Sequence, residues 1–168
     1  MVEAASFQTI FQFLQTVSIM VGIAYYFIVM NNQRKNQKLT ATYDMLEFYK
    51  DPKVYHQWLE VLRLEWDDVD DFFAKYNTTE WQSKWANMFQ QFNGYGLMWK
   101  KGLIDIDEFA HMMPGCQLLW VRYKPVVERW RVINYSESFM EWEELSKALE
   151  PLVNDNWGTY VRDNYPIT

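Results

Sequence analysis

The chain has 168 residues, a net charge of −6, two histidines and a single cysteine. Its length supports one domain, or one domain plus a small appendage, and its acidic balance argues against nucleic-acid binding, which needs a concentrated cationic surface. The lone Cys116 excludes an internal disulfide and any multi-cysteine metal site, whereas nine tryptophans predict a core rich in aromatic rings.

The first predicted element is an apolar segment over residues 4–33, which contains no charged side chain. As a helix, its most apolar stretch, 7–30, would be about 36 Å long, enough to cross a hydrocarbon layer of about 30 Å. A secretory signal peptide would begin with basic residues and end at a cleavage site of small residues. Here Glu3 comes first and no such site follows Met30. A buried core helix is the other alternative, and we expect an uncleaved transmembrane anchor.

The charges on either side of the anchor predict its orientation. Arg34, Lys35 and Lys38 follow the segment, while Glu3 is the only charged residue before it. Because basic residues flanking a membrane helix stay on the cytoplasmic side, we expect a single-pass protein of the cell membrane. Its N-terminus would lie outside, and residues 34–168 would form a cytoplasmic domain.

Three amide side chains interrupt the apolar segment. Gln8, Gln12 and Gln15 recur at i, i+4 and i+7, so they share one face of a helix. Amide groups that face lipid tails are costly, which favours a contact with a helix of another membrane subunit or of a second copy of the chain. In the alternative interpretation, Gln8 and Gln12 simply lie in the outer headgroup zone of the lipid.

Helical patterns continue after the anchor. Residues 34–50 are expected to extend the membrane helix, and Asp51 followed by Pro52 indicates a cap with proline at the first helical position. The acidic run 67–71 is either a turn or the first turn of a short helix that ends at Tyr76. The helix that begins at Pro52 would bury the face formed by Val54, Trp58, Val61 and Leu62.

The next predicted helix begins with Asn77 and Glu80, which have the spacing of a capping box. Its apolar residues follow helical spacing over about five turns, and Gly102 ends it. Asp105 with Glu108 repeats the capping pattern and begins another helix. The inward face of the first of these helices would consist of Trp81, Trp85, Met88, Phe89, Phe92, Tyr95, Gly96 and Trp99.

The last third of the chain contains helix breakers. Pro114-Gly115 should kink or break the helix in which it lies, and Pro125 is a second disturbance. Ser138 with Glu141 is expected to open the final helix. No stretch alternates in the manner of a strand. We therefore expect an all-α fold with one N-terminal transmembrane helix followed by a four- to five-helix cytosolic bundle.

Several stretches carry a resemblance: Val17–Tyr26 in the anchor, Asn36–Lys38 at its exit, and a hairpin over Phe89–Arg131. Within the hairpin, the similar residues are Phe92–Leu97, Lys101–Asp105, Trp120 and Pro125–Arg131. Their order resembles a family of uncharacterised single-pass membrane proteins of archaea and bacteria, in which an N-terminal helix precedes a small α-helical domain. The resemblance implies the anchor, the hairpin and the topology, and it brings no catalytic residues. Pro114-Gly115 departs from it, because an unbroken helix is expected there.

The two histidines are candidate metal ligands. Glu108 and His111 have the spacing of half a di-iron carboxylate site in a helical bundle, but Lys53 stands where His56 would need a glutamate. His56 and Glu60 lie one helical turn apart and could hold one divalent ion, although such a pair is more often solvated. We expect no metal and no cofactor.

Two further patterns are similar to metal sites. The acidic run 67–71 lacks the glycine and the bidentate glutamate of a calcium loop. Cys116 with Met112 and Met113 would suit a soft metal or redox chemistry. A solvated acidic turn and a buried, inert thiol in the core are the favoured interpretations.

The strongest candidate surface is a basic and aromatic cluster in the last third of the chain. It contains Arg122, Arg129, Trp130 and Arg131, with Trp120, Tyr123 and Lys124 beside them. Arginine and tryptophan are favoured at the centres of protein interfaces, and such a cluster could also meet the anionic lipid of the inner leaflet. The alternative is a solvated face over core aromatics.

These patterns predict a non-enzymatic, membrane-anchored interaction module that serves as an accessory or scaffold subunit of a larger membrane protein complex. Its partner-binding residues would be Gln8, Gln12, Gln15, Arg122, Arg129, Trp130 and Arg131. The alternative is a sensor or enzyme that binds a metal or a small ligand within the bundle. That alternative predicts that His56, His111 and nearby carboxylates converge.

Overall fold

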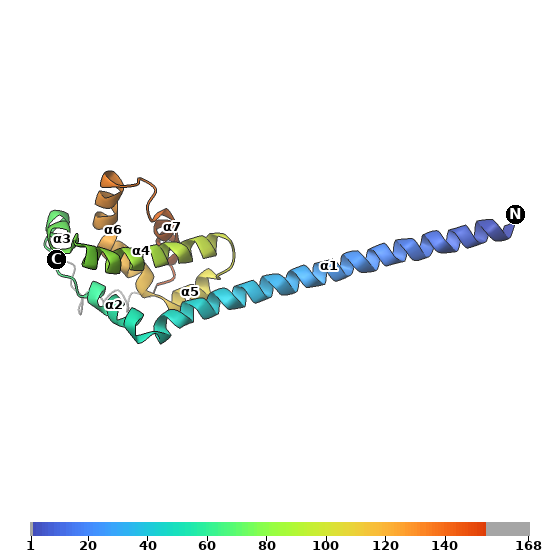
Figure 1. Ribbon diagram of the computed structural model, residues 1–168, viewed down its shortest axis with the longest axis horizontal. Coiled ribbons are helices and arrows are strands. Elements are labelled where there is room, and N and C mark those ends of the chain that lie inside the picture. The colour runs from blue at the N-terminus through green and yellow to red at the C-terminus, as the bar shows by residue number, and fades with distance from the viewer. Residues whose placement is uncertain (1, 154–168) are drawn as a thin grey trace. The chain divides into compact units, whose positions relative to one another are not determined.

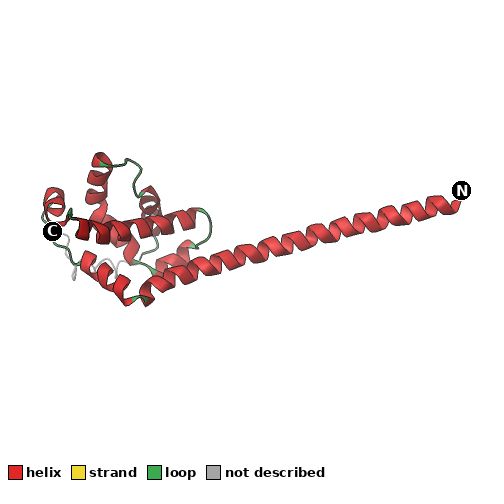
Figure 2. Cartoon of the chain, viewed as in Figure 1, coloured by secondary structure: helices red, strands yellow, loops and turns green. Residues whose placement is uncertain are grey.

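A computed structural model describes residues 2–153 of the chain. Within that range it contains α-helices joined by loops and turns, and no strand (Figure 2), which confirms the predicted all-α class for these residues. The last part of the predicted cytosolic domain, 154–168, lies outside the described residues. The helices are α1 Val2–Lys50, α2 Pro52–Leu62, α3 Val69–Tyr76, α4 Thr79–Lys100, α5 Ile106–Met112, α6 Gly115–Ile133 and α7 Met140–Leu149 (Figure 1).

The chain divides into two compact units, Met1–Thr40 and Ala41–Thr168. The described part of the first unit is a single helical segment, because all of it belongs to α1. By length and composition, the stretch Phe7–Glu47 of this helix could cross a membrane. The second unit begins with the last turns of α1 and contains α2 to α7; we call it the helical domain.

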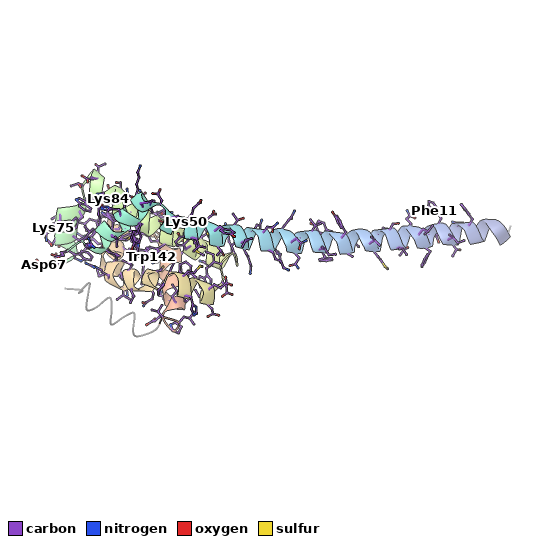
Figure 3. The ribbon with its side chains drawn as sticks, turned by 90° about the horizontal axis from the view of Figure 1, so that it is seen from below. Phe11, Lys50, Asp67, Lys75, Lys84 and Trp142 are labelled. Atoms are coloured by element: carbon purple, nitrogen blue, oxygen red, sulfur yellow. The ribbon has the colours of Figure 1, made fainter. Side chains whose placement is uncertain are left out.

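Apolar side chains of the first unit are exposed. The ring of Phe11 projects outward from α1 (Figure 3), with 62% of its surface accessible. Further exposed side chains lie all round the helix: Phe7, Ile10, Phe13, Leu14, Ile19, Met20, Val21, Ile23, Tyr25, Tyr26, Phe27 and Ile28. Exposure of so much contiguous apolar surface to water is unfavourable, which is consistent with a helix that is long and apolar enough to cross a membrane.

Side-chain caps begin the first helices of the helical domain. The Asp51 carboxylate accepts a hydrogen bond from the Lys53 N–H at 2.9 Å, and Asp68 and Asp105 cap α3 and α5 in the same way. Each cap satisfies a backbone N–H that has no partner within the helix. The predicted starts at Asp51 and Asp105 are confirmed, as is the short helix that ends at Tyr76.

An aromatic core holds the helical domain together. Trp85, Phe89 and Phe92 of α4 are buried, which confirms the predicted inward face of this helix. The Phe89 ring lies 5.0 Å from the rings of both Tyr123 on α6 and Trp142 on α7, a separation at which aromatic rings attract one another. Trp142 lies inside the domain (Figure 3) and is fully buried.

The backbones of α4 and α7 come into direct contact at Gly96. A Cβ atom at this position would lie 2.1 Å from the carbonyl oxygen of Glu141, which is far closer than two such atoms can approach. The absence of a side chain at Gly96 therefore allows α7 to pack on α4. This contact places the N-terminal end of α7 against α4.

The number of helices differs from the prediction. The helical domain contains six complete helices among the described residues, rather than four to five. Asp68 caps α3 as a helix of its own, and Pro114-Gly115 divides the predicted second arm of the hairpin into α5 and α6. Pro125 is exposed and does not end α6. The helix continues although proline has no N–H, so that one backbone hydrogen bond is missing.

Two helix starts also differ from the prediction. The Thr78 hydroxyl, rather than Asn77, caps α4, and Asn77 instead ends α3. Ser138 lies in the loop before α7, which begins at Met140. Both differences amount to one or two residues, and the second one arises from a contact with α4, described below.

Candidate functional site

A cleft of about 610 Å³ lies between α4 and the loop that joins α6 to α7. Its volume falls within the range of roughly 300–1,000 Å³ that is usual for binding pockets. One face of α4 forms one wall, while the loop and the first residues of α7 form the other. The lining residues are Ala86, Asn87, Gln90, Asn93, Trp130, Tyr135, Glu137, Ser138, Phe139, Met140 and Glu141.

The α4 wall of the cleft is polar. Asn87 and Gln90 lie between the positions that α4 turns toward the core and are exposed on its outer side. Asn93 is half-buried on the flank of α4 that faces α7. The side-chain oxygen of Asn93 accepts a hydrogen bond from the Trp142 N–H at 3.2 Å. Asn93 thus supplies, from another helix, the cap that α7 lacks in its own sequence.

The loop wall includes a residue with unusual backbone geometry. Phe139, the residue before α7, is left-handed, with φ 60° and ψ 29°. This conformation costs a residue other than glycine about 1–2 kcal/mol. The Phe139 ring is buried and lies edge-on to Phe89 at 5.6 Å, so burial of the ring stabilises the strained backbone and sets the direction in which α7 leaves the loop.

Arg131 holds the loop in place. Its Nε donates a hydrogen bond to the carbonyl oxygen of Ser138 at 2.8 Å, and its Nη1 donates one to Glu143 Oε2 at 2.7 Å. The guanidinium therefore joins the end of α6 to the loop and to α7. Glu143 also accepts a hydrogen bond from Lys147 at 2.7 Å. The wall of the cleft is thus held by contacts within the domain.

We expect Glu143→Gln to weaken the domain in a pH-dependent manner. Hydrogen bonds from Lys147 and Arg131 lower the pKa of the Glu143 carboxyl below its ordinary value of 4.5. Such a carboxyl stabilises the folded chain above the pKa of the unfolded chain, and the contribution is lost as the pH falls through the folded-state pKa. The variant should be less stable by about 1 kcal/mol at pH 7.

The difference in stability should begin to narrow below about pH 4.5, where the carboxyl of the unfolded chain takes up a proton, and should disappear as the pH falls through the lower folded-state pKa. Urea denaturation, followed by circular dichroism at about pH 7, 4.5 and 2.5, measures the difference in free energy of unfolding between the wild type and the variant. Glu128→Gln, on the exposed side of α6, is the control and should change little. A difference that stayed constant over this pH range would contradict the stabilising role of the ionised Glu143 carboxylate.

The rim of the cleft is apolar and acidic. Tyr135 and Met140 line the cleft and are exposed, and Val132 and Ile133, which precede the loop, are exposed as well. Among the described residues, the only charged side chains that line the cleft are Glu137 and Glu141. Exposed apolar residues gathered beside a cleft are typical of a surface that binds another molecule.

The predicted partner-binding residues of α6 lie in different environments. Trp130 lines the cleft, with its ring edge-on to Trp85 at 5.2 Å. Arg131 lies behind the cleft wall and holds the loop. The other two arginines lie outside the cleft lining.

Arg122 and Arg129 make contacts within the domain. Arg122 donates hydrogen bonds to the carbonyl oxygens of Leu62, at 2.8 Å, and Leu64, and its guanidinium lies over the ring of Trp66. It therefore joins α6 to the end of α2. Arg129 is more exposed and lies 3.7 Å from an oxygen of Asp70.

Sequence reasoning missed most of the cleft. Gln8, Gln12 and Gln15, the other predicted partner-binding residues, are exposed on α1 in the first unit. Tyr135, Glu137 and Met140 were not among the expected site residues, although a polar run between two helical patterns, followed by Phe139 and Met140, marks the loop. That signal locates a turn, but it does not show which helix the turn faces.

The candidate metal ligands do not converge in the described part of the chain. His56 Nδ1 lies 3.5 Å from Glu60, and His111 Nδ1 lies 2.7 Å from the carbonyl oxygen of Asp107. No group of three or more His, Cys, Asp or Glu side chains within residues 2–153 could hold a metal ion. Cys116 is buried, and burial raises the pKa of its thiol far above the ordinary value, which makes the thiol unreactive at neutral pH.

Comparison with known proteins places these elements in one family. A family model described as "Domain of unknown function (DUF4760)" matches residues 10–149. The match extends from the apolar part of α1 to the end of α7, so it includes most of both units and all the described lining of the cleft. No curated protein and no solved structure matches the chain.

Proposed function

This chain belongs to the DUF4760 family, and we propose that it is a single-pass membrane protein whose helical domain binds a protein partner through the cleft beside α4. Its N-terminus lies outside the cell and its helical domain lies in the cytoplasm. It acts as an accessory or scaffold subunit rather than as an enzyme.

The exposed apolar surface of α1 supports the membrane anchor. A core helix of a soluble protein would bury one face, whereas the candidate membrane window is not buried at all. Lipid tails would cover this surface and would remove the cost of its contact with water. The cations Arg34, Lys35 and Lys38 just after the apolar stretch support a cytoplasmic helical domain.

The cleft carries the proposal of a protein partner. Tyr135 and Met140, which line the cleft, are 61% and 41% exposed. The loop that carries Tyr135 and leads into Met140 is held by Arg131 and by the buried Phe139 ring. A rigid surface with exposed apolar side chains loses little entropy when it binds a partner.

We expect the chain to resist extraction from membranes by alkaline carbonate, because its anchor is embedded in lipid. In sealed inside-out vesicles, added protease should digest the helical domain, whereas right-side-out vesicles should protect it. Replacing Arg34, Lys35 and Lys38 by glutamate should reduce the bias toward this orientation.

Replacing Lys53, Lys101 and Lys124 by glutamate is the matched control. It changes the net charge equally, at exposed positions of the helical domain, and should leave the orientation unchanged. Release of the wild-type chain by carbonate would overturn the anchor, and protection of the helical domain in inside-out vesicles would overturn the orientation.

A further inference from the structure

We propose that the cleft binds an amphipathic helix of the partner protein, and that this helix places a lysine or arginine between apolar side chains. The inference rests on the proposed function and names the chemistry of the partner. It follows from the charge of the lining, from the apolar rim, and from the state of the backbone around the cleft.

The charge of the lining selects a cation. Within residues 2–153, Glu137 and Glu141 are the only charged residues that line the cleft, and both are acidic. The Tyr135 hydroxyl donates a hydrogen bond to Glu137 Oε2 at 2.7 Å, which orients that carboxylate. The cations nearest in sequence, Arg131 and Lys147, both pair with Glu143. On α4, Lys100 pairs with Glu144 at 2.8 Å. A cationic side chain would complement the two acidic groups.

The apolar rim indicates that the partner also carries apolar side chains beside the cation. The indole of Trp130 and the side chains of Met140 and Tyr135 flank the acidic groups. Methionine adapts its shape to different apolar partners, and tyrosine and tryptophan are favoured at protein interfaces. A small polyamine would leave these groups uncovered, whereas leucine-like side chains beside the cation would cover them. Phosphate headgroups and nucleic acids would be repelled by the carboxylates.

The backbone around the cleft favours a helix as the occupant. The walls are formed by α4 and α7, whose internal N–H and C=O groups are already paired within each helix. In the loop, the Ser138 N–H donates to the Tyr135 carbonyl, and the Ser138 carbonyl accepts from Arg131. The described part of the chain contains no strand whose edge could pair with an extended peptide, whereas a helix brings its own backbone hydrogen bonds.

Three synthetic peptides test the inference. Each has about 14 residues and the same leucine face on a helix, and its other face carries lysine, glutamine or glutamate. The full-length chain in phosphatidylcholine nanodiscs carries the photoreactive residue benzoylphenylalanine in place of Gln90, which is exposed in the cleft. Crosslinking then reports occupancy of the cleft itself and not adsorption to lipid. The same residue in place of Val121, exposed on α6 outside the cleft, gives the background.

We expect the lysine peptide to crosslink at a concentration about tenfold lower than the glutamate peptide, with the glutamine peptide between them. In the double variant Glu137→Gln and Glu141→Gln, the three peptides should crosslink at similar concentrations. The control variant Glu65→Gln and Glu128→Gln removes two exposed carboxylates outside the cleft and should preserve the order.

The other outcomes separate this inference from the proposed function. Equal crosslinking of all three peptides, or preference for the glutamate peptide, would overturn the cationic partner and leave the cleft as a protein-binding site. Complete displacement of the lysine peptide by equimolar spermine would reassign the cleft to a small cation. If no peptide crosslinked above the Val121 background, the cleft would not be the binding surface. The membrane anchor would be unaffected by this result, because the carbonate extraction tests it separately.

Discussion

Gly96→Ala is expected to destabilise the helical domain by about 3 kcal/mol or more. The added methyl group would lie 2.1 Å from the carbonyl oxygen of Glu141 and 2.9 Å from its Cβ. The backbone oxygen cannot move without displacing α7, which Asn93 and the strained Phe139 also position. The change should therefore separate α7 from α4 and weaken the wall of the cleft as well.

Gly94→Ala in the same helix is the matched control. A Cβ atom at Gly94 would meet no atom within 4 Å, and alanine is favoured over glycine inside a helix by about 0.5–1 kcal/mol. We expect this variant to be slightly stabilised. Urea denaturation in mild detergent, followed by circular dichroism, compares the two changes. If Gly96→Ala were as stable as Gly94→Ala, the result would contradict the close contact between α4 and α7 at Gly96.

Trp142→Ala is expected to lower the free energy of unfolding by about 4 kcal/mol. The indole is fully buried, with ring centroids of Phe89, Phe92 and Trp120 at 5.0, 5.2 and 5.1 Å. Its Nε1–H also donates a hydrogen bond to the Cys116 carbonyl oxygen at 3.2 Å. Truncation would leave a large cavity between α4, α6 and α7, and such a loss is a large share of the stability of a small domain.

Tyr135→Ala is the control for the loss of an aromatic ring. Tyr135 is exposed at the rim of the cleft, so its removal should change the stability by no more than about 0.5 kcal/mol. Thermal unfolding of the two variants in the same detergent separates a core role from a surface role. If Trp142→Ala lowered the free energy of unfolding by less than about 1 kcal/mol, the result would contradict the burial of this ring in the core.

Local signals in the sequence determined the helix starts at Asp51 and Asp105. The caps at Asp51 and Asp105 could be predicted because each carboxylate binds an N–H two or three residues away, and no other part of the chain is needed. The inward face of α4 could be predicted for a similar reason, since helical spacing alone places Trp85, Phe89 and Phe92 on one side. The long apolar helix α1 follows from composition.

The tertiary structure decided where α7 begins and what Arg122 and Arg131 do. The cap of α7 comes from Asn93, 49 residues before the N–H that it binds, so no local pattern around Ser138 could show it. Arg122 binds the carbonyl of Leu62, 60 residues away. These arginines are similar to interface residues in sequence, but their hydrogen bonds lie within the domain.

The cleft likewise depends on contacts between distant segments. Its walls meet because Gly96 lets α7 approach α4 and because the Phe139 ring is buried against Phe89. The sequence by itself determined an all-helical chain with an apolar N-terminal helix and an aromatic core, since those features depend on composition and spacing. Only the tertiary structure brought Glu137, Glu141 and Trp130 to one surface, because their proximity depends on how the helices pack and not on their order along the chain.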